Sequence, residues 1–205
     1  MPRGVAVQAA EMATGERVPT VPRDAATVVL LRPGGSSGFE VLLLCRTRAM
    51  DFAPGAHVFP GGSVDPGDAD VAAAAVRETF EECGVLLEAA DLVPWSRWIT
   101  PEISARRFDT WFFVAALPPD SSFAISVAES DAAEWLTPAA ALDAAQAGRI
   151  TLLPPTAVTL ASLTSFTSIE DVLAQRRSIV PLMPSVVVED GQPWLEMPDG
   201  VEYPL

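Results

Sequence analysis

The sequence predicts a single α/β domain in which helices lie on the faces of a mixed β-sheet. An apolar, β-branched run at residues 25–31 is followed by a glycine-rich turn and a second apolar run at 40–45, which is the pattern of a β-hairpin. A helix-forming run, VAAAAVRETFEEC, occupies residues 71–83. Further strands and helices follow without the regular βαβ alternation of a doubly wound fold, so we expect a mixed sheet.

The helix at 71–83 is the best-defined element. Asp70 or a neighbouring residue can serve as the N-cap, and Gly84 suits the left-handed position that ends a helix. The preceding residues 51–68 contain too many prolines and glycines for a helix. We therefore expect a long, shaped loop there, with a short strand at 56–59.

The remaining elements follow from apolar patterning and from proline and glycine stops. We expect strands at 95–100, 109–117 and 134–136, helices at 138–148, 155–162 and 169–176, and a hairpin over 186–197. This organisation divides the chain into three parts. They are a loosely held arm at 1–23, a core at 24–149, and a helical and hairpin extension at 150–205 that packs on the core.

Composition limits the classes of partner. The 205 residues suit one domain, and a formal net charge of −14 argues against a nucleic-acid partner, whose phosphates require Lys and Arg. The two cysteines, Cys45 and Cys83, provide neither a disulfide framework nor zinc-ligand spacing. We find no apolar run long enough for a signal peptide or a membrane span, so we expect a cytoplasmic protein with no membrane partner. The apolar C-terminal segment could serve a homodimer or cover the core.

Three glutamates share one face of the predicted helix, because residues three and four apart lie together. They are Glu78, Glu81 and Glu82. The opposite face is predicted to be dry and contains Ala72, Val76, Phe80 and Cys83. Small residues continue the acidic face toward the helix start, which would let the Gly61–Gly62 loop lie close against it.

A divalent cation would offset the repulsion among these carboxylates. Mg²⁺ and Mn²⁺ prefer oxygen ligands and commonly pair a few carboxylates with substrate phosphates. The alternative is a solvated acidic face, which is common on helices. Arg77 before the first glutamate, Gly84 after the last and the glycine loop upstream together favour the metal site.

These residues resemble the Nudix hydrolases, whose signature is G-x5-E-x7-R-E-U-x-E-E-x-G-U with U aliphatic. The second half matches residues 77–85, RETFEECGV, with Thr79 at the first aliphatic position. The run FPGG at 59–62 precedes it. If Gly62 opens the motif, the acidic position falls on Asp68 and the loop is one residue longer than in the family.

The resemblance implies an α/β/α sandwich and hydrolysis of a diphosphate linkage in a nucleoside diphosphate joined to another group. It makes Glu78 and Glu82 the main ligands of Mg²⁺ or Mn²⁺, with Glu81 assisting and the Gly61 carbonyl adding an oxygen. Arg77 would orient the acidic side chains. Structural roles are expected for Gly62, Asp68, Arg77 and Gly84.

A second resemblance concerns the substrate. The run LLLCRTR at 42–48, the FPGG that follows and the run RRFDT at 106–110 are similar to the coenzyme A diphosphatase subgroup of the peroxisomal type. This makes coenzyme A or an acyl derivative the leading substrate, with 3′,5′-ADP and a phosphopantetheine as products. The alternatives are ADP-ribose, NADH or a dinucleoside polyphosphate as substrate, or a module that senses a nucleotide without hydrolysing it.

Residues outside the signature complete the expected site. Glu129 is the candidate general base, with Glu134 as its rival. Arginine can contact phosphate bidentately. The expected substrate-binding residues are Arg46, Arg48, Arg107 and Phe59. We expect packing roles for His57, Trp95, Trp98 and Trp111, and an inert thiol at Cys83.

Overall fold

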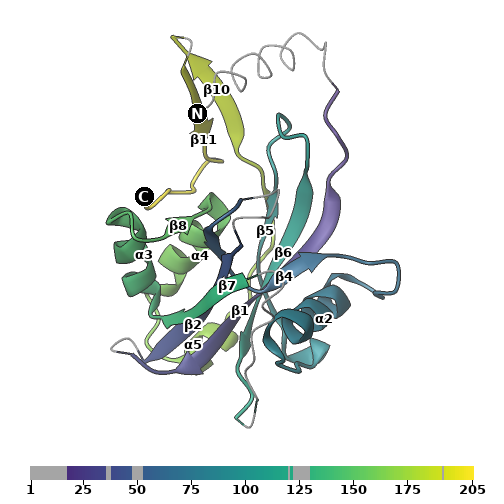
Figure 1. Ribbon diagram of the computed structural model, residues 1–205, viewed down its shortest axis with the longest axis vertical. Coiled ribbons are helices and arrows are strands. Elements are labelled where there is room, and N and C mark those ends of the chain that lie inside the picture. The colour runs from purple at the N-terminus through teal and green to yellow at the C-terminus, as the bar shows by residue number, and fades with distance from the viewer. Residues whose placement is uncertain (1–17, 36–37, 48–52, 120, 122–129, 191) are drawn as a thin grey trace.

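A computed structural model describes residues 18–35, 38–47, 53–119, 121, 130–190 and 192–205. Nine of the described strands form one mixed sheet, whose main path runs β8-β3-β2-β1-β6-β5-β9, with β4 added to β1 and β7 to β2. Helix α2 covers one face of the sheet, and α3, α4 and α5 lie on the other side (Figure 1). The predicted α/β/α sandwich is therefore confirmed.

The predicted elements are present, with small changes at their ends. The strands are β1 Arg23–Pro33, β2 Phe39–Arg46, β3 Ala56–Val58, β4 Gly61–Ser63, β5 Val93–Ile99, β6 Phe108–Ala116, β7 Ser130–Leu136, β8 Thr151–Leu152, β9 Pro181–Leu182, β10 Ser185–Glu189 and β11 Gln192–Glu196. The helices are α2 Val71–Cys83, the 3₁₀ turn η1 Ala89–Asp91, α3 Pro138–Gln146, α4 Pro154–Leu163 and α5 Ile169–Leu173.

Strand β1 is the centre of the sheet. Its apolar run, residues 25–31, is buried throughout. The strand pairs antiparallel with β2, as the hairpin pattern predicts, and also antiparallel with β4. Its other edge pairs in parallel with β6, where Ala25 lies opposite Thr110. This parallel pair brings the glycine loop and the start of β6 to the same end of the sheet.

Alternate residues of the strands supply two cores. One face of β1 contributes Val29 and Leu31 to a cluster with α3, α4 and α5. The other face contributes Val28 and Leu30 to a cluster with α2. The period of two along a strand thus places α2 and the later helices on opposite faces.

The C-terminal segment takes part in the main core. Leu160 and Leu163 of α4 and Val172 of α5 are fully buried in the cluster with β1. Strand β9 pairs in parallel with β5, and β10 and β11 form a separate hairpin. No helix in the described ranges has the length and apolar character needed to cross a membrane.

Candidate functional site

Helix α2 begins and ends at the residues that the sequence indicates. The Asp70 carboxylate accepts hydrogen bonds from the N–H groups of Ala72 and Ala73, both at 2.9 Å. At the other end, Gly84 has φ 69° and its N–H donates to the Phe80 carbonyl. These two caps fix the register of the helix and therefore the direction of its glutamates.

The orientation of α2 differs from the prediction. Phe80, expected on a dry face, is 53% exposed, whereas Glu82 is only 9% exposed. Ala74 and Ala75 are fully buried, and their small side chains let the acidic face close on β1 and β4. The expected dry face is therefore present in part. Cys83 is fully buried and Ala72 and Val76 pack against the core, but Phe80 is exposed because the helix is seated by its small residues and not by its largest apolar one. The expected contact with the glycine loop is confirmed.

The glycine loop is held against both the sheet and the helix. The Gly61 N–H donates to Glu82 Oε2 at 2.9 Å. On the sheet side, the Pro60 carbonyl accepts from Thr27 Oγ1 at 2.6 Å and from the Val28 N–H at 2.8 Å. Gly61 has φ 152°, and a Cβ at this position would overlap backbone atoms of Ala26 and Thr27. Only glycine allows this close approach of β4 to β1.

Gly62 is needed for a different reason. A Cβ at this position would overlap the carboxylate of Glu78, whereas the backbone lies outside the left-handed region. Gly62 therefore gives space to a side chain and not to a backbone. The two glycines together place Glu78 and Glu82 beside the loop.

Arg77 connects the loop to the glutamates. Its guanidinium forms a bidentate pair with Asp68, with Nε at 3.0 Å and Nη2 at 2.9 Å from the two carboxylate oxygens. Nη1 donates to Glu78 at 2.9 Å and to Glu81 at 3.1 Å. A further bond, from Nη2, reaches the Ser63 carbonyl. Arg77 thus orients two of the acidic side chains, in line with the role that the sequence suggests.

Asp68 holds the Arg77 guanidinium in place. Hydrogen bonds from Arg77 and from the Asp65 N–H hold the pKa of Asp68 below its ordinary value, although burial opposes the shift. The same pairing with Asp68, assisted by Glu78, raises the pKa of Arg77. In this loop, one residue longer than the family pattern, the acidic residue anchors the arginine.

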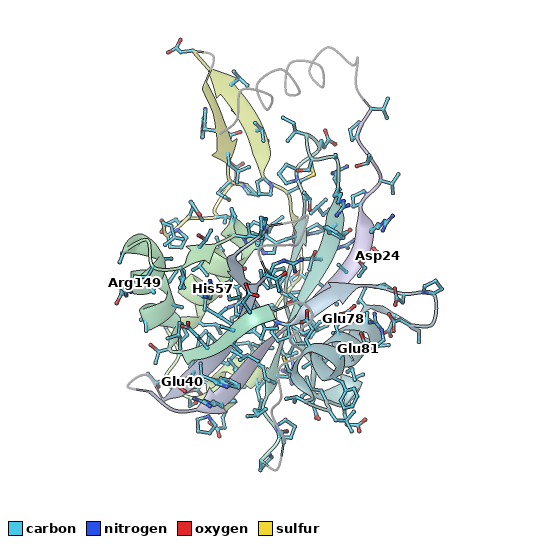
Figure 2. The ribbon with its side chains drawn as sticks, in the orientation of Figure 1. Asp24, Glu40, His57, Glu78, Glu81 and Arg149 are labelled. Carbon is cyan, nitrogen blue, oxygen red and sulfur yellow. The ribbon has the colours of Figure 1, made fainter. Side chains whose placement is uncertain are left out.

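Glu78, Glu82 and the backbone of Gly61 have the chemistry of a divalent cation site. Both carboxylates meet the same loop, and Glu78 and Glu81 extend from α2 beside it (Figure 2). Within the described ranges, no three acidic, histidine or cysteine side chains are gathered as a metal cluster. Glu81 is 55% exposed and paired with Arg77. A set of two carboxylates suits Mg²⁺ or Mn²⁺, which use few protein ligands together with substrate phosphates.

A cavity of about 690 Å³ opens beside the glutamates. Gly61, Gly62 and Glu78 line its acidic end, and Phe59 and Phe112 line its floor on the sheet. Its volume lies within the ~300–1,000 Å³ of ordinary small-molecule sites. The structure therefore places the expected metal ligand Glu78 and the expected substrate-binding Phe59 in one cavity.

Two arginines line this cavity, and one of them differs from the prediction. Arg46 lies in the lining as expected, and its companion is Arg106. Arg107 is buried and donates to the carbonyls of Thr100 and Thr20, at 3.0 and 2.8 Å. The expected phosphate contact by Arg107 is therefore corrected, because its guanidinium is occupied in packing. The run RRF indicates an arginine near the cavity. The position of each arginine relative to the start of β6 decides which of the two lines it.

The other candidate residues either do not line the cavity or lie outside the described part of the chain. Glu129 and Arg48 lie outside the described residues. Glu134 is exposed on β7. Its charge opposes the effect of burial on His57, whose pKa is nevertheless lowered. His57 is 92% buried in β3, consistent with packing and not with proton transfer to a ligand.

The tryptophans and Cys83 have the packing roles predicted for them. Trp95 donates from Nε1 to Ser162 Oγ on α4 at 2.9 Å, Trp98 is 3% exposed, and Trp111 stacks on Phe113 at 6.2 Å between ring centroids. Burial, with a smaller effect of the Glu82 charge, raises the pKa of Cys83 to about 12. A thiol in this environment remains protonated and inert.

The NUDIX domain family matches residues 21–154. The chain belongs to the Nudix family. A putative Nudix hydrolase 7 of Caenorhabditis elegans is 30% identical over 172 residues, which cover 65% of this chain and 57% of that protein. The acyl-coenzyme A diphosphatase NUDT19 of Xenopus laevis is 24% identical over 237 residues, 66% of this chain and 62% of that protein.

A solved Nudix structure has the same architecture. The NUDIX hydrolase from Alicyclobacillus acidocaldarius superposes with a TM-score of 0.70 at 29% identity, over 76% of this chain and 97% of that one. The chain spans about three fifths of the length of the two curated relatives. The Nudix match ends at residue 154, so α4, α5 and the β10–β11 hairpin lie almost wholly beyond it.

Proposed function

We propose that this Nudix protein hydrolyses a diphosphate linkage with the help of a divalent cation, and that coenzyme A or an acyl-coenzyme A is its substrate. The products would be 3′,5′-ADP and a phosphopantetheine or its acyl derivative. One observation carries the proposal. Among the described residues, the lining of a single cavity combines Glu78, two arginines and a set of apolar residues, which suits a diphosphate attached to a long, partly apolar group.

The residues of the chain have separate roles in the proposed reaction. Glu78 and Glu82 would hold the cation, and the Gly61 N–H keeps the Glu82 carboxylate against the loop. When bound, the cation supplies polarisation of a phosphoryl oxygen and activation of water. Arg46 and Arg106 line the same cavity, where guanidinium groups can bind phosphate oxygens. Glu129 and Glu134 remain the proposed candidates for the general base.

Glu82→Gln tests the reaction class. Gln keeps the oxygen that accepts from the Gly61 N–H, so we expect the fold to survive, while the cation loses one of two anionic ligands. The rate with Mg²⁺ or Mn²⁺ should fall by roughly a hundredfold or more. Circular dichroism and thermal unfolding check the fold. A fully active Glu82→Gln protein would exclude the proposed chemistry.

A substrate panel with product identification tests the substrate. We expect the highest kcat/KM for coenzyme A or its thioesters, with release of 3′,5′-ADP. Preference for ADP-ribose, NADH or a dinucleoside polyphosphate would keep the chemistry and change the substrate. Binding of these compounds without turnover, in either metal, would favour a sensing module. A cytoplasmic location and a homodimer remain predictions from the sequence.

A further inference from the structure

We infer that the C-terminal hairpin supplies part of the wall that binds the acyl chain of the substrate, and that Leu195 is a specificity-determining residue. This inference rests on the proposed function and deepens it. The wall, here called the distal wall, consists of the cavity-lining residues Leu153, Pro154, Pro155, Pro184 and Leu195. All five come from the last third of the chain, and the Nudix match ends at residue 154.

The chemistry of the distal wall favours an alkyl chain. Its five residues are apolar, and its three prolines have no N–H to donate. Pro101, from the connection between β5 and β6, extends the same character. A group that needs hydrogen bonds would lose them on moving from water to this surface, whereas methylene groups gain by leaving water.

Three of the four aromatic residues in the described lining of the cavity offer no stacking platform for a base. Trp98, Phe59 and Phe112 are 3%, 3% and 6% exposed, so their ring faces are covered by the core. Phe59 and Phe112 pack edge to face against each other, with centroids 6.4 Å apart. A nucleobase stacks on an open ring face. The fourth lining aromatic, Phe108 at the start of β6, is partly exposed, but the distal wall itself contains no aromatic residue. The occupant of the distal wall is therefore the acyl chain and not the adenine.

The hairpin places Leu195 in the lining by its register. Leu195 on β11 lies opposite Val186 on β10, directly after Pro184 leads into the hairpin. Its neighbour Trp194 projects to the other face of the strand, is 42% exposed and does not line the cavity. Figure 1 shows this hairpin extending beyond the end of β5 and β6. The two adjacent residues thus form a matched pair for a test.

The test compares Leu195→Glu with Trp194→Glu, using coenzyme A and its acetyl, octanoyl and palmitoyl thioesters. Leu195→Glu should lower kcat/KM for the octanoyl and palmitoyl thioesters by about tenfold, through KM, with a small effect on coenzyme A itself. Trp194→Glu should leave the dependence on chain length unchanged. Leu195→Ala, a milder change, should give an intermediate loss and covers the case in which the charged variant does not fold.

Each outcome decides the inference. An equal effect of both glutamate variants, or an equal loss for all four substrates after Leu195→Glu, would overturn it, the latter by indicating that the wall binds a part common to all four substrates. If wild-type protein hydrolyses acyl-coenzyme A but chain length and Leu195 do not interact, only the inference fails. If the wild-type protein hydrolyses no coenzyme A compound, the proposed substrate fails and the inference fails with it.

Discussion

The two ends of the cavity are built in different ways. At the acidic end, the lining residues Gly61, Gly62 and Glu78 and their partners Arg77 and Glu82 lie within 22 residues of one another in the sequence. They are fixed by ion pairs, helix caps and a close backbone approach. The distal wall is assembled from three separate segments and has apolar side chains and prolines. The chemistry is thus encoded locally, whereas the shape around the substrate depends on long-range folding.

The two ends of the cavity should therefore differ in the substitutions that they tolerate. The acidic end depends on the position of charged atoms, so a displacement of about an ångström can cost two orders of magnitude in rate. The distal wall depends on exclusion of water, so its substitutions change affinity in smaller steps. Variants at the two ends should therefore differ in kind, in kcat at one and in KM at the other.

Gly62→Ala should have the largest effect on this comparison. The added methyl group meets the carboxylate of Glu78, a flexible side chain, so Glu78 must move while the backbone stays. We expect kcat to fall about a hundredfold with little change in the free energy of unfolding. Gly67→Ala, in the same loop with no heavy atom within 4 Å of the new Cβ, is the control. Equal activities of the two variants would show that the acidic end is not sensitive to position.

Asp68→Asn should have a smaller effect that depends on pH. The pKa of Asp68 is lowered in the folded protein, so its pairing with Arg77 stabilises the fold above the unfolded pKa, about 3.9, and this contribution is lost as the pH falls through the lower folded pKa. Urea unfolding should show the variant less stable than wild type at pH 7 and nearly equal in strong acid.

The matched control is Asp65→Asn. Asp65 also faces Arg77, but at 3.9 Å and with 67% of its side chain exposed, so its removal should change stability less. Activity should fall about tenfold for Asp68→Asn, because Arg77 loses the anchor from which it orients Glu78. A greater loss of stability for Asp65→Asn would contradict the proposed role of Asp68.

The smallest effect concerns the thiols. Cys83 is fully buried in the core beside α2 and its pKa is raised to about 12, so at pH 8 it stays protonated. A thiol reagent should modify at most Cys45 in the native protein and both cysteines after unfolding, which mass spectrometry can count. Rapid labelling of native Cys83 would mean that α2 separates readily from the sheet, and the acidic end would then be less rigid than the distal wall.

Much of the fold could be predicted from the sequence, because apolar patterning, turns and helix caps indicate the same elements. The β1–β2 hairpin and the caps of α2 follow from residues close together in the chain. The parallel pairing of β1 with β6 and the addition of β9 to β5 were not predicted. These pairs join strands separated by about 80 residues, and their partners are selected by packing in the whole domain and not by any local pattern.

The candidate site could be predicted from the sequence to a similar degree. The glycine loop, Arg77 and the glutamates follow from spacing, but hydrophobicity placed Phe80 inside the protein, where the structure has small residues and Glu82. Arg106 and Arg107 are chemically equal in the sequence. A one-residue difference beside the start of β6 sends Arg106 to the cavity and Arg107 into packing. Strand register decides which of two adjacent residues faces the cavity, and no single residue type in the sequence indicates that register.

The buried guanidinium of Arg107 also joins three distant segments. It contacts Thr20 before β1, Thr100 after β5 and, through Nη2 at 3.4 Å, the sulfur of Met183 before the hairpin. Local opening at this edge must break all three contacts together, so the N-terminal strand and the approach to the hairpin form one cooperative unit of unfolding.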